Sequence, residues 1–337
     1  MTDPHLPDAP GAPLRVARAA GCWVQDASGR RYLDLTGAAG VLGHRHRAVT
    51  DAVRDQLDRV TSTGRWLDGD RMQGLLDALA GLAPGARPTV LGSGRAALQA
   101  AVQAARARRP DGATWIVSES PSAASLDGAR PEGHPSALAP DAAIAAVVVE
   151  PHGGAIPGAW AALGRACARH DVALVLDETR FGLGRSGAAT AAGTAALEGL
   201  RPDWIAVSDG LTGGIGELGA LLALRPELAL PPPSGVGPVQ AAAAQAAVTA
   251  LCSPDLLARG RAVASGLRAA IGPAASGVGL WVEVALGGPP GTALQALRAR
   301  GLLAAPASPD RIALIPPLVM TSSELQWAAA QLAESLR

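Results

Sequence analysis

The 337-residue sequence contains no lysine, so all 29 of its basic side chains are arginines. This absence excludes a Schiff base on a side-chain amine, a phosphate-binding P-loop lysine and a lysine general base from this polypeptide. Alanine and arginine are abundant, as coding DNA rich in G and C produces, and this bias accounts for most surface positions. It does not account for the loss of a lysine that a reaction requires.

The sequence also has few cysteines and no excess of charge of either sign. The three cysteines, Cys22, Cys167 and Cys252, are odd in number and far apart, which excludes a disulfide framework and fits a reducing cytoplasm. The 29 acidic residues balance the basic ones, so no basic face is predicted for nucleic acid. No apolar run reaches the roughly 20 residues of a membrane helix, and the first residues lack a signal-peptide core. We therefore expect a cytoplasmic protein that binds neither nucleic acid nor membranes.

Hydrophobic residues make up 48% of the chain, and strand-like and helix-like segments alternate through its middle. This alternation predicts a mainly parallel sheet covered by helices on both faces. The expected strands are Pro88–Leu91, Thr114–Ser118, Ile144–Val149, Val172–Leu176, Trp204–Val207 and Leu218–Leu224.

Helical periodicity is clear in several segments between and after these strands. The first is Arg47–Val60, in which Val49, Val53, Leu57 and Val60 share one face. A proline- and glycine-rich stretch, residues 228–238, predicts a hinge before a C-terminal lobe. The other expected helices are Asp70–Leu82, Arg95–Arg108, Trp160–His170, a long one from about Val239, and Ser322–Leu336.

Acidic residues follow the ends of three expected strands: Glu150, the pair Asp177 and Glu178, and Asp209. Ligands of open α/β sheets bind beyond the carboxyl ends of the strands, so these carboxylates are candidates for acid–base catalysis, with His152 two residues after Glu150. Each also has a structural interpretation. Asp177 and Glu178 would hold the glycine-rich loop that follows them, and Asp209 would cap the next turn.

Several strings, in the right order, resemble the class III aminotransferases, which are pyridoxal-phosphate enzymes of fold type I. Leu42-Gly-His-Arg-His46 resembles the family's Gly-His-x-His-Pro motif, and Val149-Glu-Pro151 resembles its Glu-Pro strand end. The most specific match is Asp177-Glu-Thr-Arg-Phe-Gly-Leu-Gly-Arg-Ser-Gly187, which resembles the signature Asp-Glu-Val-Gln-x-Gly-x-Gly-Arg-x-Gly along its whole length.

The resemblance covers nearly the whole chain and implies an α/β, fold type I architecture. This architecture comprises a large domain with a mostly parallel seven-stranded sheet and a smaller α+β domain built from both termini. On this basis residues 1–46 begin the small domain, residues 47–237 form the large domain, and residues 238–337 form a linking helix and the rest of the small domain. The resemblance also implies a dimer, either a homodimer or a heterodimer with an active aminotransferase.

The same resemblance implies that the reaction has changed. In the family, the lysine that binds the cofactor lies in a Lys-Gly-Leu string after the strand that corresponds to Trp204–Val207, and this chain has Asp209-Gly-Leu211 there. An aspartate forms no imine, so the chain resembles a divergent member in which ordinary transamination is excluded. Asp177, which by resemblance pairs with the pyridine nitrogen of the cofactor, is retained.

Other residues by which the family holds its ligands are also replaced. The phosphate-loop string Ser-Gly-Thr-Glu-Ala reads Ser93-Gly-Arg-Ala-Ala97, and the ring that stacks on the cofactor is lost at Pro121-Ser-Ala123. Ala313 stands in place of the substrate-binding arginine, with Arg311 two residues earlier on the same side of that strand. The remaining candidates to hold a substrate anion or a noncovalent cofactor are Ser93, Gly94, Arg95, Arg185 and Arg311.

Four hypotheses follow. We favour an enzyme of specialised metabolism that needs no pyridoxal phosphate and uses Glu150, Asp177, Glu178, Asp209 and His152 for dehydration, cyclisation or condensation of an anionic small molecule. The alternatives are an inactive partner subunit of an active paralogue, noncovalent use of pyridoxal or pyridoxamine phosphate, and a small-molecule carrier. No metal site is predicted, because no ligand spacing supports one.

Overall fold

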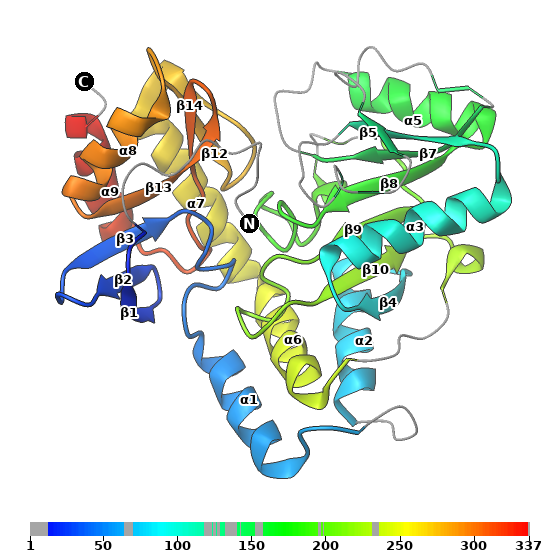
Figure 1. Cartoon of the computed structure of the whole chain (residues 1–337), viewed down its shortest axis with the longest axis horizontal. Helices are drawn as coiled ribbons and strands as arrows, with labels where there is room; N and C mark the ends of the chain where they lie inside the picture. The colour runs from blue at the N-terminus through cyan, green and yellow to red at the C-terminus, as the bar shows by residue number, and fades with distance from the viewer. Residues whose placement is uncertain are drawn as a thin grey trace. The chain divides into compact units, whose positions relative to one another are not determined.

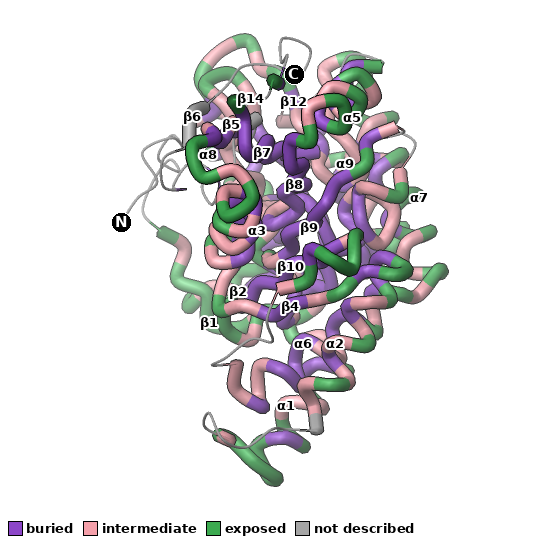
Figure 2. The backbone as a smooth tube through the Cα atoms, turned by 90° about the vertical axis from the view of Figure 1, so that its right-hand side faces the viewer, coloured by how far each residue is buried: buried purple, intermediate pink, exposed green. Residues whose placement is uncertain are grey.

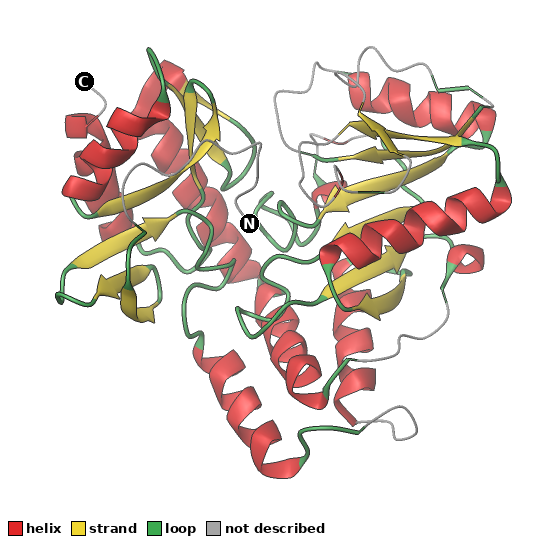
Figure 3. Cartoon of the chain, in the orientation of Figure 1, coloured by secondary structure: helices red, strands yellow, loops and turns green. Residues whose placement is uncertain are grey.

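The computed structural model describes residues 13–63, 70–117, 123, 126, 129–131, 140–141, 143–151, 158–194, 197, 199–230 and 236–335. The chain forms two compact units. Unit 1 consists of Met1–Arg47, Gly184–Gly187 and Ser253–Arg337, and unit 2 consists of Ala48–Leu183 and Ala188–Cys252. Figure 1 labels their helices and strands, and Figure 3 colours them by type.

Unit 2 is built on a seven-stranded sheet in the order β4-β10-β9-β8-β7-β5-β6. Strands β5 to β9 pair in parallel, which confirms the mainly parallel sheet expected from the alternating pattern. Strand β10 runs antiparallel to both of its neighbours, β4 and β9. The strands are β4 (Arg87–Leu91), β5 (Ala113–Val117), β6 (Ala129–Pro131), β7 (Ile144–Val149), β8 (Ala173–Glu178), β9 (Trp204–Val207) and β10 (Gly219–Ala223).

The core of unit 2 lies between this sheet and helix α3 (Gly94–Arg108), which packs across β7, β8, β9 and β10. Four of its six buried residues are glycine or alanine, so little side-chain volume separates this helix from the sheet. Figure 2 shows β7, β8 and β9 buried along their length. Trp204 is fully buried at the start of β9, where its indole Nε1 donates a hydrogen bond to the carbonyl of Leu228 at 3.2 Å.

Other α-helices in the described part of this unit are α1 (Arg47–Arg59), α2 (Asp70–Leu82), α5 (Ala159–His170) and α6 (Pro238–Leu251). Helices α2 and α6 pack against each other. Helix α1 differs from the expected pattern, because Val49 is buried while Leu57 is 52% exposed and Val60, just after the helix, is 43% exposed. The apolar face of α1 is therefore only partly covered by the described part of the chain.

Unit 1 is an α+β assembly of the two ends of the chain, as the resemblance implied. Its strands follow the order β1-β2-β3-β13-β14-β12-β11, and β3 pairs in parallel with β13 through Leu33 and Leu302. Trp23 on β2 stacks at a tilt on Trp327, with ring centroids 5.3 Å apart. The strands are β1 (Val16–Ala20), β2 (Trp23–Asp26), β3 (Arg31–Leu35), β11 (Ala275–Ser276), β12 (Val282–Ala285), β13 (Leu302–Ser308) and β14 (Arg311–Leu314).

In the described part of unit 1, the α-helices are α7 (Pro254–Ile271), α8 (Pro290–Ala299) and α9 (Ser322–Ser335). Across the described ranges, no single helix combines the length and apolar character needed to cross a membrane. Helices α6 and α7 meet that test only when taken together, and a bend of 70° separates them.

Candidate functional site

A pocket of about 400 Å³ lies at the carboxyl ends of β8 and β9 in unit 2. Parallel pairing places Asp177 opposite Ala206 and Glu178 opposite Val207, so the residues after both strands reach the same edge of the sheet. We call this the strand-end pocket. Its polar lining residues with side chains are Thr179, Arg180, Ser208, Asp209, Thr212 and Glu217.

Asp209 is the one predicted carboxylate among the described lining residues of this pocket. It directly follows Ser208, the first residue beyond β9, and its side chain is exposed. Its backbone N–H donates to the carbonyl of Thr179 at 2.7 Å, which ties the ends of β8 and β9 together. The residues after it form turns held by backbone bonds such as Leu211 N–H to Ser208 C=O, and the cap of the next turn by Asp209 stays a prediction.

Asp177 is fully buried at the end of β8 and acts on the pocket through Thr179. The backbone N–H of Thr179 donates to Asp177 Oδ1 at 2.9 Å, and its hydroxyl donates to the same oxygen at 2.6 Å. This pair of bonds fixes the Thr179 side chain, which lines the pocket. The role of Asp177 in the described geometry is therefore to position Thr179.

Glu178 points into the protein interior and holds the loop that follows. It is 1% exposed, and its Oε1 accepts hydrogen bonds from the N–H groups of Ala191 and Ala192 at 2.8 and 3.4 Å. No described residue bonds to Oε2, which faces Gly182; a Cβ there would lie 3.1 Å from this oxygen. Burial raises the pKa of Glu178 to about 7, against the effect of the two N–H donors.

Glu150 is also buried, and it forms a two-pronged ion pair. Arg180 donates from Nε to Oε1 and from Nη2 to Oε2, both at 2.9 Å. The Glu150 side chain is 1% exposed, whereas that of Arg180 is 24% exposed and reaches the pocket. Bidentate geometry fixes the plane of a guanidinium, so Glu150 positions Arg180 for a ligand.

The turn before α3 forms another wall of the pocket. The hydroxyl of Ser93 accepts from Ala96 N–H at 3.1 Å and caps the helix, while Gly94 lines the pocket. A Cβ on Gly94 would come within 2.7 Å of Ser208 Cβ, so only glycine allows this approach. Arg95, on the first turn of α3, is exposed and lies outside the lining.

Two other predicted residues, Arg185 and Arg311, belong to unit 1 and are not among the described lining residues of this pocket. Arg185 belongs to unit 1, is 2% exposed, and its carbonyl accepts from Leu280 N–H at 2.7 Å. Arg311, also in unit 1, donates from Nη1 to Ser276 Oγ at 2.8 Å. His152 lies outside the described residues.

Sequence reasoning missed Arg180, Thr179 and Glu217 as pocket residues. Arg180 and Thr179 lie inside the Asp177-Glu-Thr-Arg string, directly after a predicted strand end, so their position was a usable signal. Glu217 had no such signal, because it reaches the pocket from the turn before the antiparallel strand β10. Among the described residues, no set of three or more histidine, cysteine or acidic side chains could hold a metal ion.

The fold agrees with the comparisons to known proteins. The sequence model of the class III aminotransferases matches residues 7–119 and 136–336, so the chain belongs to that family. It is 30% identical to an ornithine aminotransferase of Bordetella pertussis, over 95% of this chain and 90% of that protein. It is 32% identical to an acetylornithine aminotransferase of Mycobacterium tuberculosis, over 95% of this chain and 91% of that protein.

Solved structures show the same fold type I architecture. An ornithine aminotransferase of Toxoplasma gondii superposes with a TM-score of 0.84 at 22% identity, covering 97% of this chain and 91% of that chain. An amine transaminase of an uncultivated Pseudomonas species, solved in its PLP-bound internal aldimine form, superposes with a TM-score of 0.79 at 22% identity, covering 96% and 95%. The expected family and fold are thereby confirmed.

Members of this family normally use pyridoxal phosphate, and the described pocket does not fit its covalently bound form. An internal aldimine requires a lysine, and the sequence has none. The charged lining residues are Arg180, Asp209 and Glu217, and the charge of Arg180 is already matched by buried Glu150. A phosphate ester carries up to two negative charges, and here it would meet two carboxylates and one guanidinium whose charge Glu150 already balances, so the net negative charge of the lining opposes it.

Proposed function

We propose that this protein is an enzyme that works without covalently bound pyridoxal phosphate and carries out acid–base chemistry in the strand-end pocket. The observation that carries this proposal is Asp209, an exposed carboxylate in the pocket of a chain without lysine. By resemblance, Asp209 stands where relatives have the lysine of the aldimine. The replacement exchanges an amine for a carboxylate, the type of group that transfers protons in general acid–base catalysis.

The lining also indicates the class of substrate. Arg180 presents a guanidinium that would bind a carboxylate, while Asp209 and Glu217 would bind an ammonium group. A small molecule carrying both groups matches this lining better than an anion alone, which refines the expectation from the sequence. The relatives are named for ornithine and acetylornithine, and ornithine is such a zwitterion with an additional amine.

The reaction that suits these groups is the condensation of an amine with a carbonyl carbon, within one molecule or between two. A C–N bond forms as the amine attacks, and the C–O bond breaks as the oxygen leaves in water. Both protons of that water come from the nitrogen, and Asp209 carries them in turn from nitrogen to oxygen. General acid–base transfer of this kind contributes about 100-fold or more to a rate.

The first test concerns the cofactor. The protein as purified, and after incubation with pyridoxal phosphate and dialysis, should show no aldimine absorbance band near the visible edge. A band that survives dialysis would overturn the proposal of a PLP-independent enzyme.

The second test concerns Asp209. Proton NMR would follow the cyclisation of a short amino aldehyde or amino ketone by wild-type protein, Asp209→Asn and the control Asp51→Asn, which removes an exposed carboxylate on α1. We expect Asp209→Asn to lower the rate by about 100-fold and the control to leave it unchanged. Equal rates for wild type and Asp209→Asn would refute the role of Asp209. Co-purification with an active aminotransferase, and no turnover alone, would instead establish a partner subunit.

We also propose that the protein is a homodimer, with α1 in the interface. Leu57 on this helix and Val60 just after it are 52% and 43% exposed, and because they are three residues apart they form one small apolar surface that a partner could cover. Sedimentation equilibrium should give a dimer, and Leu57→Asp should shift it toward monomer. A wild-type monomer would rule this assembly out.

A further inference from the structure

A second pocket, of about 650 Å³, opens at the opposite edge of the unit 2 sheet. Helix α5, the starts of β8 and β9 and the end of β10 surround it, and we call it the arginine pocket. Leu174 near the start of β8 lines it, whereas Thr179, just after the end of β8, lines the strand-end pocket. The two are separated by the length of a strand, roughly 17 Å, so the arginine pocket is a separate site.

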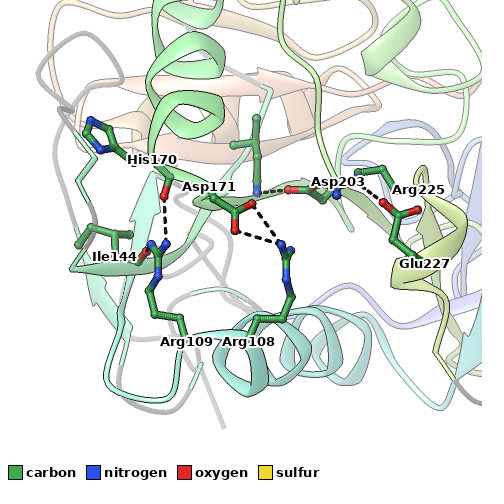
Figure 4. A network of polar contacts seen from close by, with 9 residues as sticks. Arg108, Arg109, Ile144, His170, Asp171, Asp203, Arg225 and Glu227 are labelled. Atoms are coloured by element: carbon green, nitrogen blue, oxygen red, sulfur yellow. Dashed lines mark hydrogen bonds and ion pairs between the residues drawn. The ribbon is translucent and has the colours of Figure 1, made fainter.

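The carboxylates of the arginine pocket are already matched by arginines, as Figure 4 shows. Asp203 Oδ2 accepts from Leu174 N–H at 2.8 Å, and its Oδ1 accepts from Arg225 Nη1 at 3.1 Å. Asp171 accepts two bonds from Arg108 Nη2, at 3.1 and 3.2 Å. Neither carboxylate is therefore available to compensate further positive charge in the lining.

Two more arginines, Arg165 and Arg201, line the same pocket. Both are exposed, and neither forms an ion pair with any acidic side chain in the described part of the chain. Arg201 donates from Nη1 only to the carbonyl of the preceding Leu200, at 3.1 Å. Two guanidinium groups thus face one concave surface without carboxylate partners there.

The carbonyl end of α5 also reaches this pocket and would repel an anion if it were bare. Arg109 covers it, donating from Nη2 to the carbonyl of His170 at 3.0 Å and from Nη1 to the carbonyl of Ile144 at 2.6 Å. Arg109, which directly follows α3, therefore neutralises the negative end of α5.

Beneath the arginines, the pocket has an apolar floor. Its buried members are Cys167, Val172, Leu174, Leu200 and Pro202. Burial and the negative charge of Asp203 raise the pKa of Cys167 to about 12, so its thiol stays neutral and behaves as an apolar group. Cations at the mouth above an apolar floor are the arrangement that small organic ligands require.

We propose that the arginine pocket binds an organic anion, with its phosphate or carboxylate held by Arg165 and Arg201 and its hydrocarbon body on the apolar floor. The volume of about 650 Å³ accommodates a ligand of the size of a substituted aromatic acid or larger. This site is independent of the strand-end pocket and of the reaction proposed for it.

Isothermal titration calorimetry on the full-length protein tests the proposal with phenyl phosphate, benzoate, inorganic phosphate and benzyl alcohol. We expect phenyl phosphate or benzoate to bind about tenfold or more tightly than inorganic phosphate and benzyl alcohol, because only the first two carry both a charge and a ring. If phenyl phosphate binds more tightly, the pocket prefers a phosphate, and if benzoate does, it prefers a carboxylate. Equal affinity for benzyl alcohol, or no binding of either aromatic anion, would overturn the proposal.

Variants locate the binding. Arg165→Gln and Arg201→Gln should each weaken the aromatic anion by about tenfold, whereas Arg169→Gln, on the same helix but outside the lining, should change it by less than about twofold. Ala168→Trp, which places a large side chain in the lining, should abolish binding, and circular dichroism checks the fold of each variant. A loss in Arg169→Gln as large as in Arg165→Gln would show nonspecific charge attraction instead. Loss of binding in Asp209→Asn would place the ligand in the strand-end pocket and also refute the proposal.

Discussion

Replacing Glu178 by glutamine is expected to stabilise the protein above neutral pH and to have little effect at acidic pH. Glutamine has nearly the same shape and retains an oxygen that accepts from Ala191 and Ala192, but it carries no charge into the interior. The free energy that changes is therefore the cost of holding an ionised carboxylate in a site that is 1% exposed.

The size of this change in unfolding free energy follows from the pKa of Glu178. Burial raises the pKa of Glu178 from 4.5 to about 7, so between these values the folded chain keeps a proton that the unfolded chain releases. The free energy of unfolding must then fall as pH rises through this window. At about 1.4 kcal/mol for each unit of pKa, the loss reaches about 3 kcal/mol above pH 7 and vanishes below about pH 4.5. Glu178→Gln removes this loss.

Urea unfolding at a series of pH values from about 5 to about 9, followed by far-UV circular dichroism, measures the effect. The difference in unfolding free energy between Glu178→Gln and wild type should grow in favour of the variant as pH rises. Glu217→Gln is the matched control, because it removes the same charge from an exposed position and should give a small difference that varies little with pH. If the Glu178→Gln difference is flat across the series, or if the variant is less stable at about pH 8, burial does not control this carboxyl group.

Two further substitutions test the walls of the strand-end pocket. Glu150→Gln leaves Arg180 without its carboxylate partner. We expect the unfolding free energy in urea titration to fall by about 2 kcal/mol and ornithine to bind more weakly in calorimetry. Unchanged binding would show that Arg180 does not contact the ligand. Gly219→Ala would place a Cβ 2.1 Å from the carbonyl oxygen of Ser93 and should lower the unfolding free energy by about 2 kcal/mol or more. Gly81→Ala, whose Cβ meets no atom within 4 Å in α2, should instead raise it by about 0.5 kcal/mol; similar losses in both variants would contradict the steric explanation.

The sequence predicted the elements whose signals are local. Strand β7 (Ile144–Val149), strand β9 (Trp204–Val207) and helix α2 (Asp70–Leu82) have the expected bounds, because uninterrupted apolar runs and helical periodicity are visible in single segments. Strand β1 was missed because it is a mostly exposed strand with no apolar alternation, and β13 because its sequence, Leu302–Ser308, contains a proline and small residues. Both are recognised only through the strands they pair with.

The location of the candidate site could be predicted from the sequence, but the hydrogen-bond partners of its side chains could not. Strand ends are local features, so Asp209 could be assigned to the edge where ligands bind. The bond from Arg180 to Glu150 joins residues 30 positions apart, and no sequence pattern indicates it. For the same reason the sequence could not show that Glu178 turns inward to Ala191, which leaves Asp209 as the predicted carboxylate that lines the described pocket.

The parallel pairing of Leu33 with Leu302 means that β3 is synthesised long before the strand it pairs with. Strand β3 leaves the ribosome about 270 residues before its partner β13, which at 5 to 20 residues per second is a delay of roughly 15 to 50 s. During that interval every residue of the unit 2 sheet is made, while the apolar side chains of β3 have no native strand beside them on the β13 side. Chaperone binding to nascent chains should therefore concentrate on β2 and β3, which pair with each other, and slower translation of the last third of the message should increase aggregation.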